Sequence, residues 1–278
     1  MEILDIIKES FVFPSRELGK LAIYIVFTII ISGLAVGGVL TSILSAVNYS
    51  SVGIVSIILF ICALILGFIL SGYQLSIIKS GIDQSESLSD YQWKENLING
   101  VKNLILNIVY YIIPAIIVLI VGFATKVPGN IYQVLQESIT TQVNGTIAAN
   151  STVPAVSTVS TTLMNNLVSS ISITALVAII VFLIFSFIQT MGLAKLAKTE
   201  SLSESLNMVE AFRDIGRIGY GKVIAVIILI AIISIVINGI LGLIYGYVPQ
   251  LSIISVIVSP YLIFFASRAM GLLYSDIA

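Results

Sequence analysis

The sequence predicts an all-α membrane protein, a bundle of six transmembrane helices with parallel internal repeats and cytosolic interfacial helices. Apolar residues make up 58% of the 278 residues and charged residues only 10%, whereas soluble globular proteins carry roughly 25% charged residues. Apolar runs of about 20 residues, the length that crosses a bilayer, recur along the whole chain. A polar segment lies between two of these apolar runs, and a second polar segment of the same plan lies between two later runs. We therefore expect residues 1–278 to form a single integral membrane domain.

Six apolar runs are long enough to cross the membrane. The predicted spans are Leu21–Leu44, Val52–Ile78, Leu104–Phe123, Leu167–Met191, Val223–Tyr245 and Leu251–Leu273. Before the first span, Ile3, Ile7 and Phe11 recur at helical spacing among charged residues. This pattern predicts a short amphipathic helix on the membrane surface, which ends at Pro14.

The basic residues lie almost entirely at one end of the predicted spans. Of the 13 lysines and arginines, only Lys126 falls at the other end. Because basic residues mark the cytosolic side, we expect both termini in the cytosol and the polar segment 124–166 outside the cell. Three Asn-x-Ser/Thr patterns, at Asn48, Asn144 and Asn150, fall in predicted external segments. They agree with this orientation and leave open whether any of them is glycosylated.

Two cytosolic segments, the first joint (Lys79–Lys102) and the second joint (Lys198–Lys222), follow one plan. Each contains an aromatic residue followed by a basic and an acidic residue, and a glycine further on. The residues of this joint motif are Lys79, Trp93, Lys94, Glu95 and Gly100 in the first joint, and Lys198, Phe212, Arg213, Asp214 and Gly219 in the second. The plan predicts repeat units at about 1–78, 79–191 and 192–278. Since each unit enters the membrane from the cytosol, the repeats are parallel.

Helical spacing within the joints predicts that they are interfacial helices. In the first joint, Trp93, Leu97 and Val101 lie on one helical face. Asn99 and Asn103 lie opposite. One face can then enter the headgroup layer while the other stays in water.

The stretch from Gly72 to Pro114 carries a more specific pattern. It consists of Gly72, Tyr73, Lys79, Leu88, Trp93, Gly100, Lys102, Tyr110 and Pro114. In these residues the chain resembles an uncharacterised, largely archaeal family of multi-pass membrane proteins, domain of unknown function 4013, over about Leu21 to Arg268. Family members often have proline after the leucine of the joint, where this chain has Ser89. The resemblance implies a polytopic membrane protein of archaeal type and carries over no catalytic or binding residue.

Several kinds of chemistry lack the residues that they need. The chain contains no histidine, which removes an essential group from most zinc sites and from Ser-His-Asp triads. Every Asp and Glu falls outside the predicted spans, so the buried charges typical of ion-coupled transport are not expected. The net charge of −1 offers no basic surface to nucleic acid. We expect no catalytic residue, no cofactor site and no metal site, and hence no enzyme activity.

Four carboxylates near the cytosolic surface could in principle hold a divalent ion. They are Asp83, Asp90, Glu95 and Asp214. Their spacing matches no catalytic pattern, and Lys94 and Arg213 stand next to two of them. Structural ion pairs are therefore the preferred interpretation.

Prolines, amides and glycines are the informative residues inside the spans. Pro114 and Pro260 each free a backbone carbonyl and are expected to bend their helices. The amides of Asn107 and Asn238 could line a cavity or form hydrogen bonds between helices. The Gly-x-x-x-Gly patterns Gly33/Gly37 and Gly242/Gly246 allow close helix packing, within the chain or between copies.

The function that fits best is a non-enzymatic packing or interaction protein of the cytoplasmic membrane, because the sequence shows neither buried charge nor a reactive group. Its partners would be membrane lipid, other membrane proteins or further copies of the chain. The alternative is a passive channel or carrier for neutral or lipid-like solutes, which the bent spans and the repeats favour. A membrane enzyme comes third.

Overall fold

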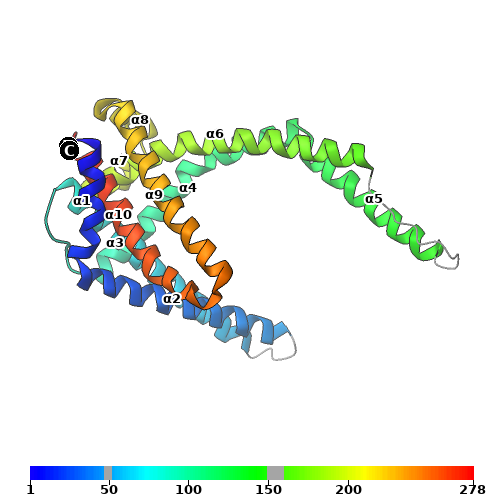
Figure 1. Cartoon of the computed structure of the whole chain (residues 1–278), viewed down its shortest axis with the longest axis horizontal. Coiled ribbons are helices and arrows are strands. Elements are labelled where there is room, and N and C mark those ends of the chain that lie inside the picture. The colour runs from blue at the N-terminus through cyan, green and yellow to red at the C-terminus, as the bar shows by residue number, and fades with distance from the viewer. Residues whose placement is uncertain (47–51, 149–159) are drawn as a thin grey trace. The chain divides into compact units, whose positions relative to one another are not determined.

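The computed structural model describes residues 1–46, 52–148 and 160–278, with the side chains of all but 141–148. The described residues form ten α-helices, labelled in Figure 1, and one 3₁₀ helix. They are α1 (Ile3–Arg16), α2 (Leu18–Ala46), α3 (Val52–Ile82), α4 (Trp93–Ala124), α5 (Val127–Ala148), α6 (Thr161–Thr199), α7 (Leu202–Ser205), α8 (Met208–Ile218), α9 (Tyr220–Tyr247), η1 (Pro249–Ile254) and α10 (Ser255–Tyr274). The prediction of an all-α fold is confirmed.

Six helical stretches are long and apolar enough to cross a membrane. They are α2, α3, α4, α6, α9 and the continuous stretch of η1 and α10, and each contains one predicted span. Many of their large apolar side chains are exposed, among them Ile179, Ile235 and Leu243. Such exposure is unfavourable in water and favourable in lipid. The chain is a multi-pass membrane protein.

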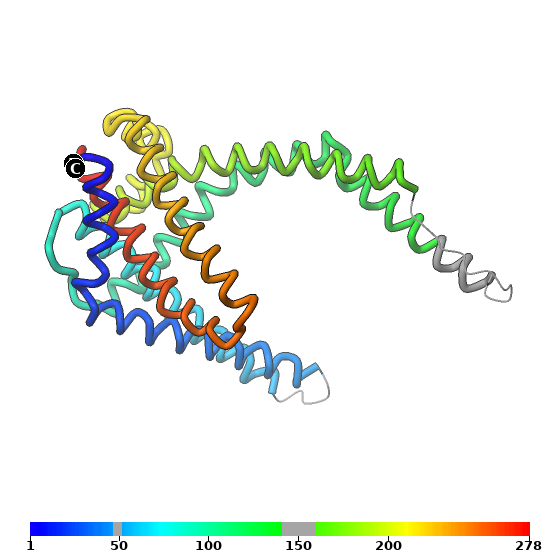
Figure 2. The backbone as a smooth tube through the Cα atoms, in the orientation of Figure 1, coloured from blue at the N-terminus to red at the C-terminus, as the bar shows by residue number. Residues whose placement is uncertain are grey.

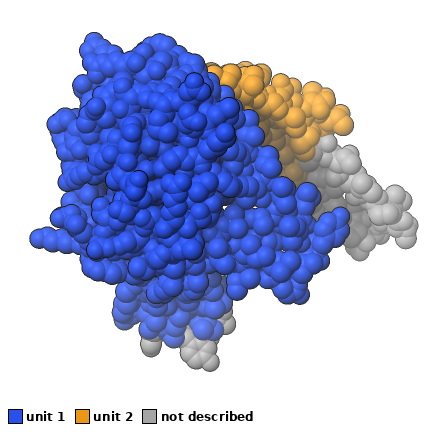
Figure 3. Space-filling model, turned by 60° about the vertical axis from the view of Figure 1, so that its left-hand side comes forward, with its two compact units in different colours: residues 1–108, 187–278 blue, residues 109–186 orange. Residues whose placement is uncertain are grey.

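The described chain divides into two compact units, coloured separately in Figure 3. Unit 1 comprises residues 1–108 and 187–278, and unit 2 comprises residues 109–186. In unit 2, the amide of Asn130 donates to Ser170 Oγ over 3.1 Å, and the hydroxyls of Thr125 and Thr174 lie 2.8 Å apart. Polar contacts therefore join the connection between α4 and α5, and the start of α5, to α6.

The predicted external segment 124–166 is largely helical where the structure describes it. It contains α5 and the start of α6 (Figure 2). Of the three potential glycosylation positions, Asn48 and Asn150 lie outside the described residues. The backbone of Asn144 belongs to α5.

The core of unit 1 is formed by α1, α2, α3 and α10 together with the first joint. Its buried side chains are Phe13, Leu21, Tyr24, Leu70, Tyr73, Ile77, Leu88 and Phe264. The rings of Tyr24 and Phe264 meet edge to face with centroids 5.4 Å apart, and Tyr73 stacks on Tyr91 at 3.7 Å. Because Phe13 lies in this core, α1 is anchored to the bundle.

Pro14, Pro114 and Pro260 each lie inside a helix. The prediction that the first helix ends at Pro14 is wrong, because α1 continues to Arg16. A proline in the last turn removes a single backbone donor, so the helix can complete that turn. Pro114 and Pro260 are likewise buried inside the continuous helices α4 and α10.

Two other helices, α4 and α10, pack so closely against α3 that their backbones nearly touch. A Cβ atom at Gly72 would lie 1.8 Å from the carbonyl oxygen of Asn96 in α4, and one at Gly100 would lie 1.9 Å from that of Phe68. Further along α3, a Cβ at Gly271 of α10 would lie 2.1 Å from the carbonyl oxygen of Ile78. Only glycine permits such close contacts.

The Gly-x-x-x-Gly patterns do not make such contacts within the described chain. A Cβ at Gly33, Gly242 or Gly246 would meet no atom within 4 Å, and one at Gly37 would meet only the flexible side chain of Leu59 at 3.4 Å. The glycine spacing alone does not reveal which helix faces another.

We predict that Gly72→Ala and Gly100→Ala each lower the stability of the protein, whereas Gly33→Ala does not. The added methyl groups collide with backbone atoms that cannot move independently, and overpacking costs about 1–3 kcal/mol or more. Thermal unfolding in detergent, followed by the loss of monodisperse protein, measures the effect. Equal midpoints for Gly100→Ala and Gly33→Ala would contradict the packing described above.

Candidate functional site

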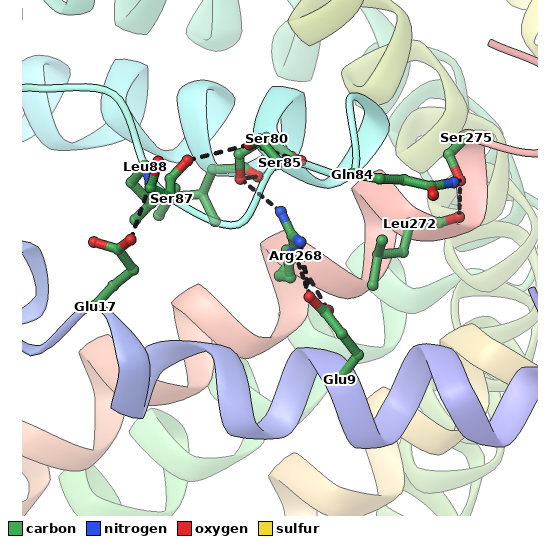
Figure 4. A network of polar contacts seen from close by, with 11 residues as sticks. Glu9, Glu17, Ser80, Gln84, Ser85, Ser87, Leu88, Arg268, Leu272 and Ser275 are labelled. Carbon is green, nitrogen blue, oxygen red and sulfur yellow. Dashed lines mark hydrogen bonds and ion pairs between the residues drawn. The ribbon is translucent and has the colours of Figure 1, made fainter.

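Arg268 connects three helices at one end of unit 1. Its side chain is only 3% exposed. The guanidinium donates to both carboxylate oxygens of Glu9 on α1, at 2.7–3.2 Å, and to the hydroxyl of Ser80 on α3, at 3.1 Å (Figure 4). It also lies 4.1 Å from the ring centroid of Phe13. We call these four residues the Arg268 clamp.

The clamp follows from the close packing of α3 and α10. Because Gly81 and Gly271 bring the two backbones together, the neighbouring Arg268 cannot reach water. A buried guanidinium is tolerated only when a carboxylate pairs with it and its remaining donors are used. Glu9 provides that pair, so α1 must dock against α10.

A second buried cluster joins α6, α8 and α10 through Asp214, which is 1% exposed. Arg217 donates to one carboxylate oxygen over 3.0 Å, and the Tyr274 hydroxyl donates to the other over 3.1 Å. Lys195 Nζ lies 3.8 Å from Asp214 and 2.9 Å from Glu210. The hydrogen bond from Lys195 holds the pKa of Glu210 below its ordinary value. We call this group the Asp214 cluster.

Twelve hydrophilic side chains line a pocket of about 170 Å³ at the first joint, which we call the joint pocket. They are Ser76, Lys79, Ser80, Asp83, Ser85, Ser89, Asp90, Gln92, Glu95, Asn96, Asn99 and Glu200. Eleven of them come from residues 76–99 and Glu200 comes from the second joint. Three of the four carboxylates singled out in the sequence therefore meet here, and Asp214 does not.

Glu200 links the two joints. Its carboxylate accepts a hydrogen bond from Lys79 over 2.6 Å, and its backbone carbonyl accepts one from Lys102 over 2.8 Å. The hydrogen bond from Lys79 is the largest cause of the lowered pKa of Glu200. At the rim of the pocket, a hydrogen bond from Lys20 lowers the pKa of Asp90.

The remaining residues of the joint motif lie outside the pocket. Trp93 begins α4, is 52% exposed and meets the ring of Phe27 edge to face at 5.3 Å. Gly219 has a φ of 107°, which favours glycine, and separates α8 from α9. The other four, Lys94, Lys198, Phe212 and Arg213, are exposed. Among the described residues, the charged neighbours expected to pair with Glu95 and Asp214 form no ion pair with them. Asp214 pairs instead with Arg217 and Lys195.

Asn107 and Asn238, the two asparagines predicted inside the spans, have different surroundings. The Gln189 amide donates to Asn107 Oδ1, and the Asn107 amide donates to Asn103 Oδ1, each over 2.8 Å. Asn103 in turn donates to Ser71 Oγ over 2.8 Å. Asn103 is thus buried against α3, not in water as predicted, because Gly100 brings this face of α4 onto α3. Asn238 is exposed and donates to the carbonyl of Ser234 in its own helix.

The family model described as protein of unknown function (DUF4013) matches residues 55–246. The chain belongs to the DUF4013 family. The match covers α3 to α9, which includes both joints, and is shorter at each end than the resemblance seen from Leu21 to Arg268. No curated protein and no solved structure matches the DUF4013 protein described here.

For several residues of these clusters in the DUF4013 protein, the neighbouring sequence gives no sign of their partners. Glu9, Lys20 and Glu200 pair with residues far away in the sequence. The expectation of no buried charge is wrong, because Arg268 and Asp214 are both buried. Arg268, an arginine inside a predicted span, was the sign that the sequence analysis missed. In the described part of the chain, no three His, Cys, Asp or Glu side chains are grouped so that they could hold a metal ion.

We predict that Arg268→Leu destabilises the protein strongly and that Glu9→Leu in the same chain recovers much of the loss. Removing one partner of a buried ion pair costs about 3–5 kcal/mol, whereas replacing both by apolar side chains is often nearly neutral. Unfolding midpoints of the two single variants and the double variant measure the coupling. Additive losses would contradict the clamp.

We also predict a small, pH-dependent effect of Glu200→Gln. Because the folded pKa of Glu200 is lowered, the ion pair stabilises the protein above the unfolded pKa, and the contribution is lost as the pH falls through the folded pKa. The pair is largely exposed, so we expect less than about 1 kcal/mol at pH 7. Unfolding midpoints of wild type and variant, measured between pH 7 and about pH 3, should converge at the acidic end. A gap that stays constant would contradict this account.

Proposed function

We propose that this DUF4013 protein is a non-enzymatic packing and interaction protein of the cytoplasmic membrane. The observation that carries the proposal is the hydrogen-bonded chain of Gln189, Asn107, Asn103 and Ser71. A path for solute or ions needs polar groups that are free to face water. Here the amides form hydrogen bonds with one another, which favours a dry and tightly packed bundle.

The charged clusters support the same function. The three buried charged residues of the described chain, Arg268, Asp214 and Lys195, are held by partners from other helices. A catalytic carboxylate or cation needs a free face toward its substrate, and these side chains are occupied within the protein. They stabilise one arrangement of the helix ends.

We further propose that both termini and both joints lie on the cytosolic side, with α1 and α8 at the membrane surface. Exposed apolar side chains support this position: Leu4 and Val12 on α1, and Val209 and Phe212 on α8. Such faces suit the headgroup layer. The element order supports the proposed parallel repeat, because α1 precedes the spans α2 and α3 as α8 precedes α9 and α10. The partners of these surfaces are membrane lipid, other membrane proteins or further copies of the chain.

We predict that single cysteines at Asn107 and Pro260 are not labelled in liposomes by a membrane-impermeant thiol reagent supplied on both sides. The background is Cys62→Ser, because Cys62 is exposed. A cysteine at the exposed joint residue Glu86 is the control and should react readily. Labelling at Asn107 and Pro260 in folded protein would reveal a water path and favour a channel or carrier for neutral or lipid-like solutes.

A further inference from the structure

Helix α8 is joined directly to a membrane span. Gly219 alone separates its last residue, Ile218, from Tyr220, the first residue of α9 (Figure 1). The ring of Tyr220 lies beside that of Phe212 on α8, with centroids 6.0 Å apart. Because α9 is long and apolar enough to cross a membrane, a helix attached to its start by one glycine lies at the membrane–water boundary. The outer side of α8 therefore meets the headgroup layer.

The apolar side chains of α8 lie on two different faces. Ala211 and Ile215 are buried inside unit 1. Val209 and Phe212, together with Tyr220 just beyond the helix, are between 48% and 64% exposed. Large apolar side chains on a helix outside the spans are unfavourable in water and favourable in the headgroup layer. The second apolar face has no function within unit 1 and suits lipid.

The charged side chains of α8 are divided in the same way. The helix contains two acids and two arginines, so its net charge is zero. Both acids have partners within the protein, because Glu210 pairs with Lys195 and Asp214 belongs to the buried cluster. Arg213 is exposed and forms no ion pair with any described residue. The side chain of Arg217 is 60% exposed even though it contacts Asp214. The outer side of this neutral helix is therefore positive.

We propose that the α8 surface, formed by Val209, Phe212, Arg213 and Tyr220, binds anionic phospholipid. The apolar side chains enter the headgroup layer, and the guanidinium of Arg213 donates to a lipid phosphate, whose oxygens match its planar set of N–H donors. A zwitterionic lipid offers the same phosphate, but its own ammonium group competes for it. An anionic lipid is therefore preferred. The inference rests on the proposed position of α8 at the membrane surface and adds the class of lipid.

The test places a fluorophore on the α8 surface of the full-length protein in nanodiscs. Trp93→Phe removes the one tryptophan of the chain, and Phe212→Trp introduces another at an exposed position. Lipids brominated near the top of the acyl chain quench a tryptophan that they contact. At equal mole fraction, brominated phosphatidylglycerol should quench at least about twofold more than brominated phosphatidylcholine, because a cation beside the membrane attracts anionic headgroups. High salt should reduce the difference.

Two arginine variants show whether Arg213 is responsible. Arg213→Gln should remove the preference for the anionic lipid and leave the quenching by phosphatidylcholine unchanged. Arg16→Gln, at another exposed arginine, is the matched control and should keep the preference. Arg16 ends α1, whereas Lys222, just beyond α8, contacts Met1 at the opposite end of that helix. Unfolding midpoints in phosphatidylcholine show that both variants remain folded.

The outcomes separate this inference from the proposed function. Equal quenching by the two lipids overturns the inference and leaves α8 at the membrane surface, as does a preference that Arg213→Gln retains or that Arg16→Gln also removes. Quenching by neither lipid overturns both the inference and the proposed position of α8, and assigns the α8 surface to a soluble partner or a second copy of the chain. The dry bundle is tested independently by the cysteine labelling at Asn107 and Pro260.

Discussion

The approach of α4 and α10 to the backbone of α3 is the constraint on which the other contacts of unit 1 depend. Gly72 on α3 and Gly100 on α4 allow these two helices to pack closely. Gly81 on α3 and Gly271 on α10 do the same for α3 and α10. Lipid tails are as apolar as leucine, so helices in a membrane gain little from burying apolar surface and associate through close packing and polar contacts. Glycine contacts of this kind provide such packing. They also decide which polar side chains lose their access to water.

The buried polar groups can be read as consequences of that packing. Arg268 stands beside the crossing at Gly271, and Asn96 and Asn103 stand on the face of α4 that Gly100 brings onto α3. Arg268 and Asn103 find partners inside the protein, since an unpaired buried polar group is costly. Arg268 uses Glu9 and Ser80, and Asn103 uses Ser71. The helix α1 is thereby tied to the bundle by a charge and not only by its apolar face.

The sequence was sufficient to locate the membrane helices, but it did not show which helices pack against one another. Apolar runs of the length of a span located all six candidate membrane helices, because hydropathy depends on local composition. The pairing of Glu9 with Arg268 and of Lys79 with Glu200 depends on which helices touch, and a local pattern contains no such information. The glycine spacing at Gly33 and Gly37 was equally uninformative. The decisive glycines, Gly72 and Gly81, are not four residues apart on α3, because each faces a different helix.

A comparison of two asparagines on α4 argues that packing is not the whole role of the first joint. Asn107 lies deeper in the span, and its amide group accepts a hydrogen bond from Gln189 and donates one to Asn103. Asn96 lies at the start of the same helix and is only 3% exposed, and its amide nitrogen has no hydrogen-bond partner among the described residues. Packing explains the first arrangement and not the second, because an apolar side chain at position 96 would fill the same space without an unsatisfied donor. Violations of this kind mark functional sites more often than the rest of a fold.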